Sequence, residues 1–245
     1  MILVLFVMVV LFRFEEEFYK KRGIQATCIG HPLIDLVKPI LQKKEFIENY
    51  RLSGDKKTIA ILPGSRKQEI RIVLPLMLEA AKLINETIPQ TQFIIAKAAN
   101  LDTQIYLNEY KKFNLDIKII DGLTHDCLNN ADASMVCSGT ATLEAAIMQK
   151  PFVIIYKTNI FNYLLYRPQV KIPYVGMVNI VAGKVIVPEF IQFVAQPKMI
   201  AKAIIELLRT PISANRMIQD LKTVKESLGE PGAAERAAKL ILEVK

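Results

Sequence analysis

The chain has 245 residues, of which 51% are hydrophobic, and a formal net charge of +8. It is long enough for one large or two modest domains with a sizeable core. The charge suits anionic partners such as phosphates or acidic membrane surfaces, whereas the lack of a dense Lys/Arg block or an aromatic-rich RNA-binding motif argues against nucleic acid. Three cysteines (Cys28, Cys127 and Cys137) without a CxxC pair favour a reduced, cytoplasmic setting.

The N-terminus is an unbroken apolar run from Met1 to Phe12, ended by Arg13. This run is too short to cross a bilayer as a helix, which takes about 20 residues. Without a leading basic residue or a small-residue cleavage site, a signal peptide is not indicated. We expect a buried strand of a larger domain, with a membrane-associating segment and a misassigned start as the alternatives.

A short charged helix at 15–22 and a strand at 24–29 follow, and the strand closes on the turn Gly30-His31-Pro32. Pro32 favours an extended His31, so the chain leaves a strand at this point. We interpret His31 as structural or solvated in preference to a ligand contact. Residues 38–57 are polar and lysine-rich, and we interpret them as a helix and loop that lead into the next domain.

A regular alternation of strands and helices begins at Thr58. The clearest helix is 69–86, in which apolar residues recur on one face. Strands without polar alternation, separated by helices, predict an α/β fold with a doubly wound, parallel, Rossmann-like sheet covered on both faces. The tail from Pro197 predicts three helical segments, broken at Pro211 and at 229–232. The predicted strands are 58–62, 92–96, 117–120, 133–137 and 152–156.

Two strand ends carry candidate ligand sites. The first opens into Gly64-Ser65-Arg66, where backbone amides and a guanidinium can hold a diphosphate. The second opens into Ser138-Gly139-Thr140, where Ser138 can cap a helix and a phosphate can lie at the helix N-terminus, with Glu144 one turn on to accept sugar hydroxyls. Ordinary turns beside surface side chains are the alternative at both places. Because the carboxyl ends of parallel strands share one edge, we expect the two loops to lie together.

Three further stretches carry polar or aromatic residues in patterns that a purely structural role does not require. Asn179 is the one polar side chain in the run 173–183, and a buried Asn needs partners, whether backbone or ligand. Glu189 and Gln192 follow Pro188 at helical spacing, as at a helix start, where mere capping is the alternative. Residues 160–167 are aromatic-rich and indicate a core helix or an acyl-chain or membrane-facing surface.

These segments occur in the order seen in lipid-A-disaccharide synthases, and the chain resembles this family from about Phe14 to its C-terminus. The resemblance implies an inverting glycosyltransferase of the GT-B fold, with residues 1–57 as a remnant of the N-terminal acceptor domain and its linker. Residues 58–245 are then the C-terminal UDP-sugar (donor) domain with its C-terminal helices. The segments that carry the resemblance are Gly30-His31-Pro32, 62–66, 138–144, 173–183 and 188–192.

The resemblance also implies an activity in lipid A synthesis. It is the transfer of 2,3-diacylglucosamine from its UDP conjugate to 2,3-diacylglucosamine 1-phosphate, with release of UDP. The implied partners are this donor, the lipid monosaccharide acceptor and the anionic inner face of the cytoplasmic membrane, where such enzymes are peripheral. No cofactor is implied, and the lack of an Asp-x-Asp motif agrees with a metal-independent transferase. The resemblance does not decide the oligomeric state, and a homodimer is one of the alternatives.

Site residues follow from the motifs of the family. The donor diphosphate is expected at the two strand-end loops, the ribose at Glu144, and the rest of the donor pocket at 179–192. Arg66 and Asn179 are the expected catalytic residues. The full substrate-binding set is Gly64, Ser65, Arg66, Ser138, Gly139, Thr140, Glu144, Asn179, Glu189 and Gln192.

The sequence departs from the family in having one complete set of strands, where a GT-B enzyme has two Rossmann-like domains. The glycine-rich N-terminal segment and the acidic residues expected as the base toward the acceptor are also missing. We therefore expect a truncated form that is inactive by itself. The alternatives are a non-catalytic UDP-sugar-binding module of a split enzyme and a UDP-GlcNAc 2-epimerase-like protein.

Overall fold

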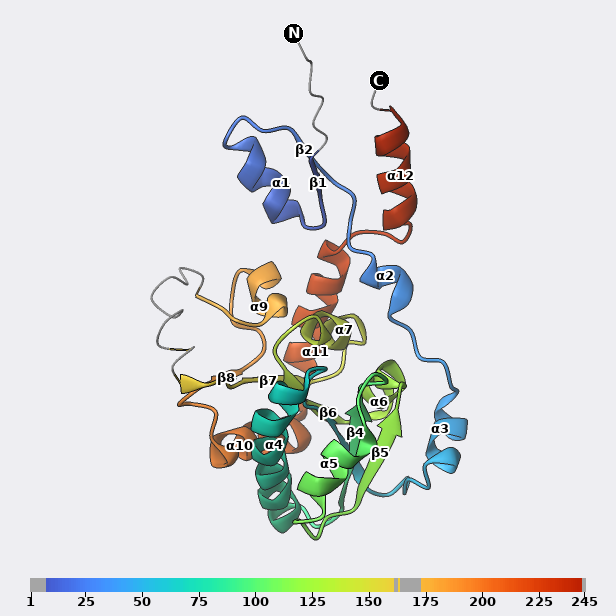
Figure 1. The fold of residues 1–245 in the computed structure, drawn as a ribbon, viewed down its shortest axis with the longest axis vertical. Helices are drawn as coiled ribbons and strands as arrows, with labels where there is room; N and C mark the ends of the chain where they lie inside the picture. The colour runs from blue at the N-terminus through green and yellow to red at the C-terminus, as the bar shows by residue number, and fades with distance from the viewer. Residues whose placement is uncertain (1–7, 161–162, 164–172, 244–245) are drawn as a thin grey trace.

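The fold is organised around a six-stranded parallel sheet of order β5-β4-β3-β6-β7-β8 (Figure 1). The computed structural model describes residues 8–160, 163 and 173–243. Five of the strands are those predicted from the sequence, so the parallel α/β class is confirmed. The strands are β3 (Lys57–Leu62), β4 (Thr91–Lys97), β5 (Ile117–Asp121), β6 (Ala133–Cys137), β7 (Phe152–Tyr156) and β8 (Glu189–Ile191).

Helices cover both faces of this sheet. The chain runs from β3 through β4 to β5 in one direction, and then returns to β6 beside β3. Because such crossovers are right-handed, α4 and α5 lie on one face and α6 and α7 on the other. The direction of winding therefore reverses between β3 and β6, where Leu62 pairs with Val136. These helices are α4 (Lys67–Thr87), α5 (Thr103–Tyr110), α6 (Thr124–Asn130) and α7 (Ala141–Ile147).

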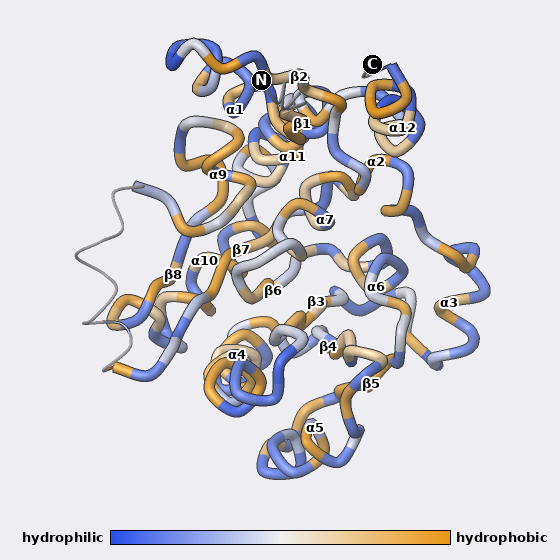
Figure 2. The backbone as a smooth tube through the Cα atoms, turned by 45° about the horizontal axis from the view of Figure 1, so that its top comes forward, coloured by the Kyte–Doolittle hydropathy of each residue, from blue (hydrophilic) through white to orange (hydrophobic). Residues whose placement is uncertain are grey.

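The long helix α4 confirms the helix predicted at 69–86. Its buried residues recur at helical spacing, and in Figure 2 its coil alternates between hydrophobic and hydrophilic colours. The tail forms the three predicted helices, α10 (Pro197–Arg209), α11 (Pro211–Ser227) and α12 (Ala233–Glu243). Pro211 begins α11, since a proline lacks the N–H that would continue α10.

The N-terminal region forms a smaller unit. Strands β1 (Met8–Val10) and β2 (Ala26–Cys28) pair in parallel and are joined by α1 (Arg13–Lys20). Short helices α2 (Leu33–Leu36) and α3 (Lys43–Asn49) then lead to β3. The expected buried strand is only partly right: Val10 is buried but Met8 is 36% exposed, because two strands cannot enclose both faces. Residues 1–7 of that run lie outside the described residues.

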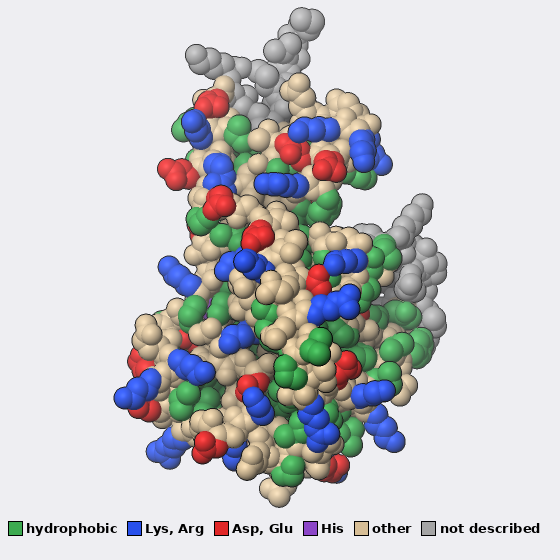
Figure 3. All heavy atoms as spheres, turned by 180° about the vertical axis from the view of Figure 1, so that it is seen from behind, with side chains coloured by type: hydrophobic (Ala, Val, Ile, Leu, Met, Phe, Trp, Pro, Cys, Tyr) green, Lys and Arg blue, Asp and Glu red, His purple; other side chains and the backbone are tan. Residues whose placement is uncertain are grey.

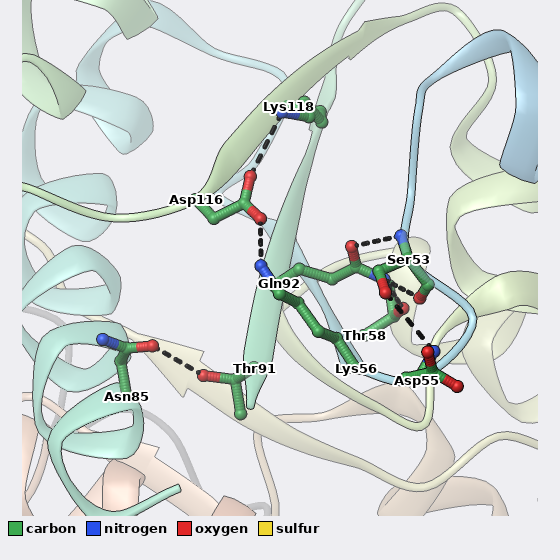
Figure 4. A network of polar contacts seen from close by, with 9 residues as sticks. All are labelled: Ser53, Asp55, Lys56, Thr58, Asn85, Thr91, Gln92, Asp116 and Lys118. Carbon is green, nitrogen blue, oxygen red and sulfur yellow. Dashed lines mark hydrogen bonds and ion pairs between the residues drawn. The ribbon is translucent and has the colours of Figure 1, made fainter. Parts of the chain in front are cut away.

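The polar segment before β3 is fastened to the start of β4 through Gln92, a buried side chain (Figure 4). Its amide nitrogen donates to the Ser53 carbonyl at 2.8 Å and to the Thr58 hydroxyl at 2.9 Å, and its oxygen accepts from the Ser53 amide. Lys56 and Lys118 both pair with Asp116 beside it. This network holds the amino ends of the strands, at the edge opposite the predicted ligand loops.

The predicted helix start at Pro188 is wrong, because Glu189–Ile191 form the edge strand β8. The Ile154 amide of β7 donates to the Pro188 carbonyl, and β7 continues to pair with β8. An open strand edge needs hydrogen-bond partners, and this need outweighs the local preference of proline for a helix start. Gln192 then leaves the strand with a positive φ of 52°.

The part of the chain that is described contains no helix with both the length and the hydropathy required to cross a membrane. The predicted aromatic surface at 160–167 lies mostly outside the described residues. On the back of the molecule, Lys and Arg side chains are spread among acidic and hydrophobic ones (Figure 3). The net charge of +8 therefore does not gather into one block on that face.

Candidate functional site

A pocket of about 280 Å³ lies at the carboxyl ends of β3 and β6. This is the edge of an open α/β sheet where ligands bind, at the point where the winding reverses. Both predicted loops open into it, so the structure brings together seven of the ten predicted site residues. The lining consists of Leu62, Gly64, Ser65, Arg66, Glu69, Ala96, Ala98, Thr124, Cys137, Ser138, Gly139, Thr140, Ala141 and Glu144.

The loop after β3 is shaped by Glu69, in the first turn of α4. One of its oxygens, Oε2, accepts from the amides of Ser65 at 3.2 Å and Arg66 at 3.3 Å, and the other, Oε1, accepts from the Arg66 guanidinium at 2.7 Å. Gly64 has φ +107°, and an added Cβ would lie 2.5 Å from Oε2, so any other residue would be strained there and would displace the Glu69 carboxylate. The Arg66 side chain is 81% exposed. The loop therefore presents an accessible cation whose orientation is set by a carboxylate.

The loop after β6 is more open. Gly139 has φ +150°, and nothing lies within 4 Å of a Cβ built on it, so its backbone is accessible to a ligand. The predicted cap at Ser138 is wrong: α7 begins after Thr140, and the Ser138 hydroxyl donates to the Val175 carbonyl at 3.2 Å. Ser138 instead ties this loop to the segment that precedes α9 (Met177–Ala182).

Glu144 lies on the first turns of α7, and its carboxylate faces His125 of α6. Glu144 Oε2 and His125 Nε2 are 3.3 Å apart, and the side chains are 20% and 27% exposed. The hydrogen bond to Glu144 raises the pKa of His125 above its usual value, against the lowering effect of burial. The pair is therefore ionic over a wider pH range than a free histidine would allow.

Cys137 ends β6 at the floor of the pocket and is buried. Burial, with the nearby Glu69 carboxylate as a second cause, raises the pKa of its thiol to about 12. At neutral pH the group is a protonated thiol, which is a poor nucleophile. Cys137 thus contributes shape to the pocket.

Asn179 has no exposed surface, and its side chain is fully used within the chain. Its amide nitrogen donates to the Val187 carbonyl and to Glu189 Oε1, both at 2.8 Å, and its oxygen accepts from the amides of Ile186 and Val187. The expectation that this Asn is buried with partners is confirmed, and the partners belong to the chain. This geometry gives Asn179 a structural part, and its predicted catalytic role stays a prediction.

Glu189 and Gln192 are likewise engaged within the chain and do not line the pocket. Glu189 accepts from the amides of Val175 and Gly176, both at 2.9 Å, and so fixes the start of α9. Gln192, 4% exposed, exchanges two hydrogen bonds with the backbone of Thr158. Their predicted substrate contacts stay predictions, whereas their observed contacts shape the loops beside the pocket.

Sequence reasoning missed Glu69, Thr124 and His125. Glu69 had a signal, because an acidic residue three positions after the residue that precedes a helix is typical of a capping box. Nothing in the sequence pairs His125 with Glu144, which lie 3.3 Å apart across two helices. Among residues 8–160, 163 and 173–243, no three His, Cys, Asp or Glu side chains gather in a way that could hold a metal ion.

Nearly the whole chain matches one family of known proteins. The family model described as lipid-A-disaccharide synthetase matches residues 3–244. A lipid-A-disaccharide synthase of Syntrophus aciditrophicus is 39% identical over 236 residues, which cover 96% of this chain and 62% of that protein. The chain therefore spans about three fifths of the length of such relatives.

Solved structures share the fold at low sequence identity. The UDP-GlcNAc 2-epimerase of Neisseria meningitidis, solved bound to UDP-GlcNAc, has a TM-score of 0.64 and 13% identity, and the match covers 97% of this chain and 61% of that one. WaaG, a glycosyltransferase involved in lipopolysaccharide biosynthesis, has a TM-score of 0.62 and 11% identity, with 96% and 62% covered. At such identities these neighbours establish the fold.

Proposed function

Because this chain belongs to the lipid-A-disaccharide synthetase family, we propose that its pocket binds the UDP part of a UDP-sugar donor. The observation that carries the proposal is the meeting of both predicted loops and Glu144 in one pocket at the switch point of the sheet. A UDP-GlcNAc 2-epimerase-like function is not favoured, since that likeness is one of fold and the family match covers residues 3–244. In this proposal residues 58–245 form the donor domain.

The diphosphate is assigned to the loop at 64–66 and the turn at 138–140. Arg66 supplies an accessible positive charge, and the amides of Ser65 and Arg66 can turn from Glu69 to phosphate oxygens. Hydrogen bonds between ionised partners are the strong ones, and a guanidinium can hold a phosphate bidentately. Glu144, at the other side of the pocket, is assigned to the ribose hydroxyls.

For the whole enzyme we propose the inverting transfer of 2,3-diacylglucosamine from UDP to a lipid monosaccharide 1-phosphate at the inner face of the cytoplasmic membrane. The acceptor hydroxyl attacks the anomeric carbon, the bond to UDP breaks, and UDP leaves with the bonding electrons while a base takes the hydroxyl proton. Arg66 stabilises the departing UDP. The pocket carboxylates, Glu69 and Glu144, already pair with Arg66 and His125, so we place the base outside this pocket.

Titration calorimetry with UDP tests the proposal on the chain itself. We expect binding, weakened in R66A by about 1.5–3 kcal/mol, the range for a hydrogen bond to a charged group, or roughly ten- to a hundredfold in Kd. R71A is the matched control, since Arg71 is exposed on the same helix but does not line the pocket. Folded protein that shows no heat with millimolar UDP would refute the donor site, and equal affinity of R66A and R71A would remove Arg66 from it.

A second comparison separates the ribose from the phosphates. We expect E144Q to weaken UDP binding and to leave inorganic pyrophosphate binding unchanged, because the carboxylate is assigned to the sugar. Equal losses for the two ligands would assign Glu144 to the phosphates or to the fold. Transfer of the sugar from the UDP donor to a radiolabelled acceptor would distinguish a catalytic chain from a non-catalytic UDP-sugar-binding module.

A further inference from the structure

Two consecutive side chains of α6, His125 and Asp126, lie between the pocket and the segment that joins α2 to α3. His125 Nε2 is 3.3 Å from Glu144 Oε2. The Asp126 carboxylate, which has no exposed surface, accepts from the amides of Ile40 at 3.0 Å and Leu41 at 2.7 Å. The start of α6 is thus fixed on one side to α7 and on the other to residues 40–41.

We propose that His125 is a positioning residue that holds the Glu144 carboxylate toward the ribose and so sets the preference of the pocket for ribonucleotides. The inference rests on the proposed binding of UDP. It assigns to His125 a part in specificity that acts through Glu144 and needs no contact between His125 and the ligand.

The geometry supports a positioning role for His125 and a ligand contact for Glu144. Glu144 Oε2 accepts from the histidine, which leaves Oε1 to accept from a ribose hydroxyl. A glutamate side chain loses considerable rotamer freedom when it is fixed, and His125 imposes this cost before the ligand arrives. Both side chains are largely but not fully buried, so the pair is shielded from solvent, and Glu144 still lines the pocket.

The histidine ring is itself held in place. The charged groups that act on it are Glu144 from α7 and Asp126 from its own helix, and both favour the protonated form. A hydrogen bond to the backbone of Lys38 acts in the same direction and raises the pKa of His125 further. His125 is therefore oriented by α7 and by the segment before α3 together, which is what a positioning residue requires.

The test compares the affinities for UDP and 2′-deoxy-UDP in wild type, H125Q, E144A and the double variant, by calorimetry. For wild type we expect a preference for UDP of roughly tenfold, the equivalent of one hydrogen bond. H125Q should reduce this preference to about two- to threefold, and E144A, which removes both accepting oxygens, should abolish it. In the E144A background H125Q should have no further effect, because its action passes through Glu144.

Two controls separate positioning from general damage. The affinity for inorganic pyrophosphate should be the same in H125Q and wild type. His31, the other of the two histidines, lies outside the pocket, so H31Q should keep the full preference. An unchanged preference in H125Q, or an equal loss of pyrophosphate affinity, would overturn the inference while leaving the donor site intact. A wild-type chain that binds no UDP would instead overturn the proposed function, and the inference with it.

Discussion

The six-stranded sheet and the two-stranded sheet of the N-terminal region are both parallel and helix-connected, yet they are stabilised very differently. In the larger sheet Ile59, Phe93 and Ile154 have no exposed surface. In the smaller unit, α1 has no buried residue, and Phe14 and Phe18 are 42% and 49% exposed. A parallel sheet needs cover on both faces, and only the larger one has it.

This difference also decides where a ligand can be held. All residues that line the pocket lie between Leu62 and Glu144, within the larger unit. The smaller unit is attached through contacts near Gly30, where the His31 amide donates to the Leu228 carbonyl and Arg236 donates to the Ile29 carbonyl. Figure 1 shows α12 standing beside β1 and β2, at a distance from β4 and β5. We therefore expect the two units to respond differently to the same substitution.

The largest contrast is expected for matched phenylalanines. F93A removes a fully buried ring from β4 and should lower the free energy of unfolding by about 3–5 kcal/mol, through lost burial and a cavity. F18A removes a half-exposed ring of α1, under the Arg22 guanidinium, and should cost less than about 1 kcal/mol. Urea unfolding of both variants measures this, and similar losses would show that the small unit is a core in its own right.

A smaller contrast is expected for two aspartates that bind backbone amides. D126A leaves two amides without their buried carboxylate and should cost about 2–3 kcal/mol of unfolding free energy. D35A removes an exposed carboxylate that accepts from the Gly232 amide at 3.0 Å, and should cost less than about 1 kcal/mol. D126A should cost more because water can replace the lost partner only at the exposed site of Asp35. Thermal unfolding measures both variants, and equal decreases in Tm would contradict this ranking.

The smallest effect is a pH dependence of opposite sign at the two histidines. The pKa of His125 is raised by Glu144, so its stabilisation is complete below the ordinary value of 6.5 and is lost as pH rises through the folded value. The pKa of His31 is lowered by burial, so its contribution is present above 6.5 and is lost as pH falls below it.

Thermal unfolding at about pH 6 and about pH 9, on either side of the ordinary histidine pKa, measures both effects. The Tm advantage of wild type over H125Q should shrink toward the higher pH, and its advantage over H31Q should shrink toward the lower one. The same slope in both pairs would contradict the opposite pKa shifts assigned to the two histidines.

Sequence reasoning fails at particular residues. The sequence around Pro188 is typical of a helix start, but the Ile154 amide of β7 donates to the Pro188 carbonyl, and the residues that follow pair with β7 as β8. Ser138 reads as a helix cap, but its hydroxyl finds the carbonyl of Val175, 37 positions away. Asn179 reads as a buried Asn in need of partners, which is right, but its sequence neighbourhood does not say that those partners are Glu189 and the backbone at 186–187.

Apolar runs and turn residues act over a few positions, so the sequence predicts the alternation of strands and helices from Thr58 to Tyr156 and the loops at the carboxyl edge. The parallel class follows from the same pattern, and with it the meeting of residues 64–66 and 138–140. The three-dimensional arrangement was needed to see which polar atoms already have partners within the chain, as for Asn179, and which side chains from different helices meet, as for His125 and Glu144. A hydrogen bond has a reach of about 3 Å, so it depends on side-chain positions that local patterns do not encode.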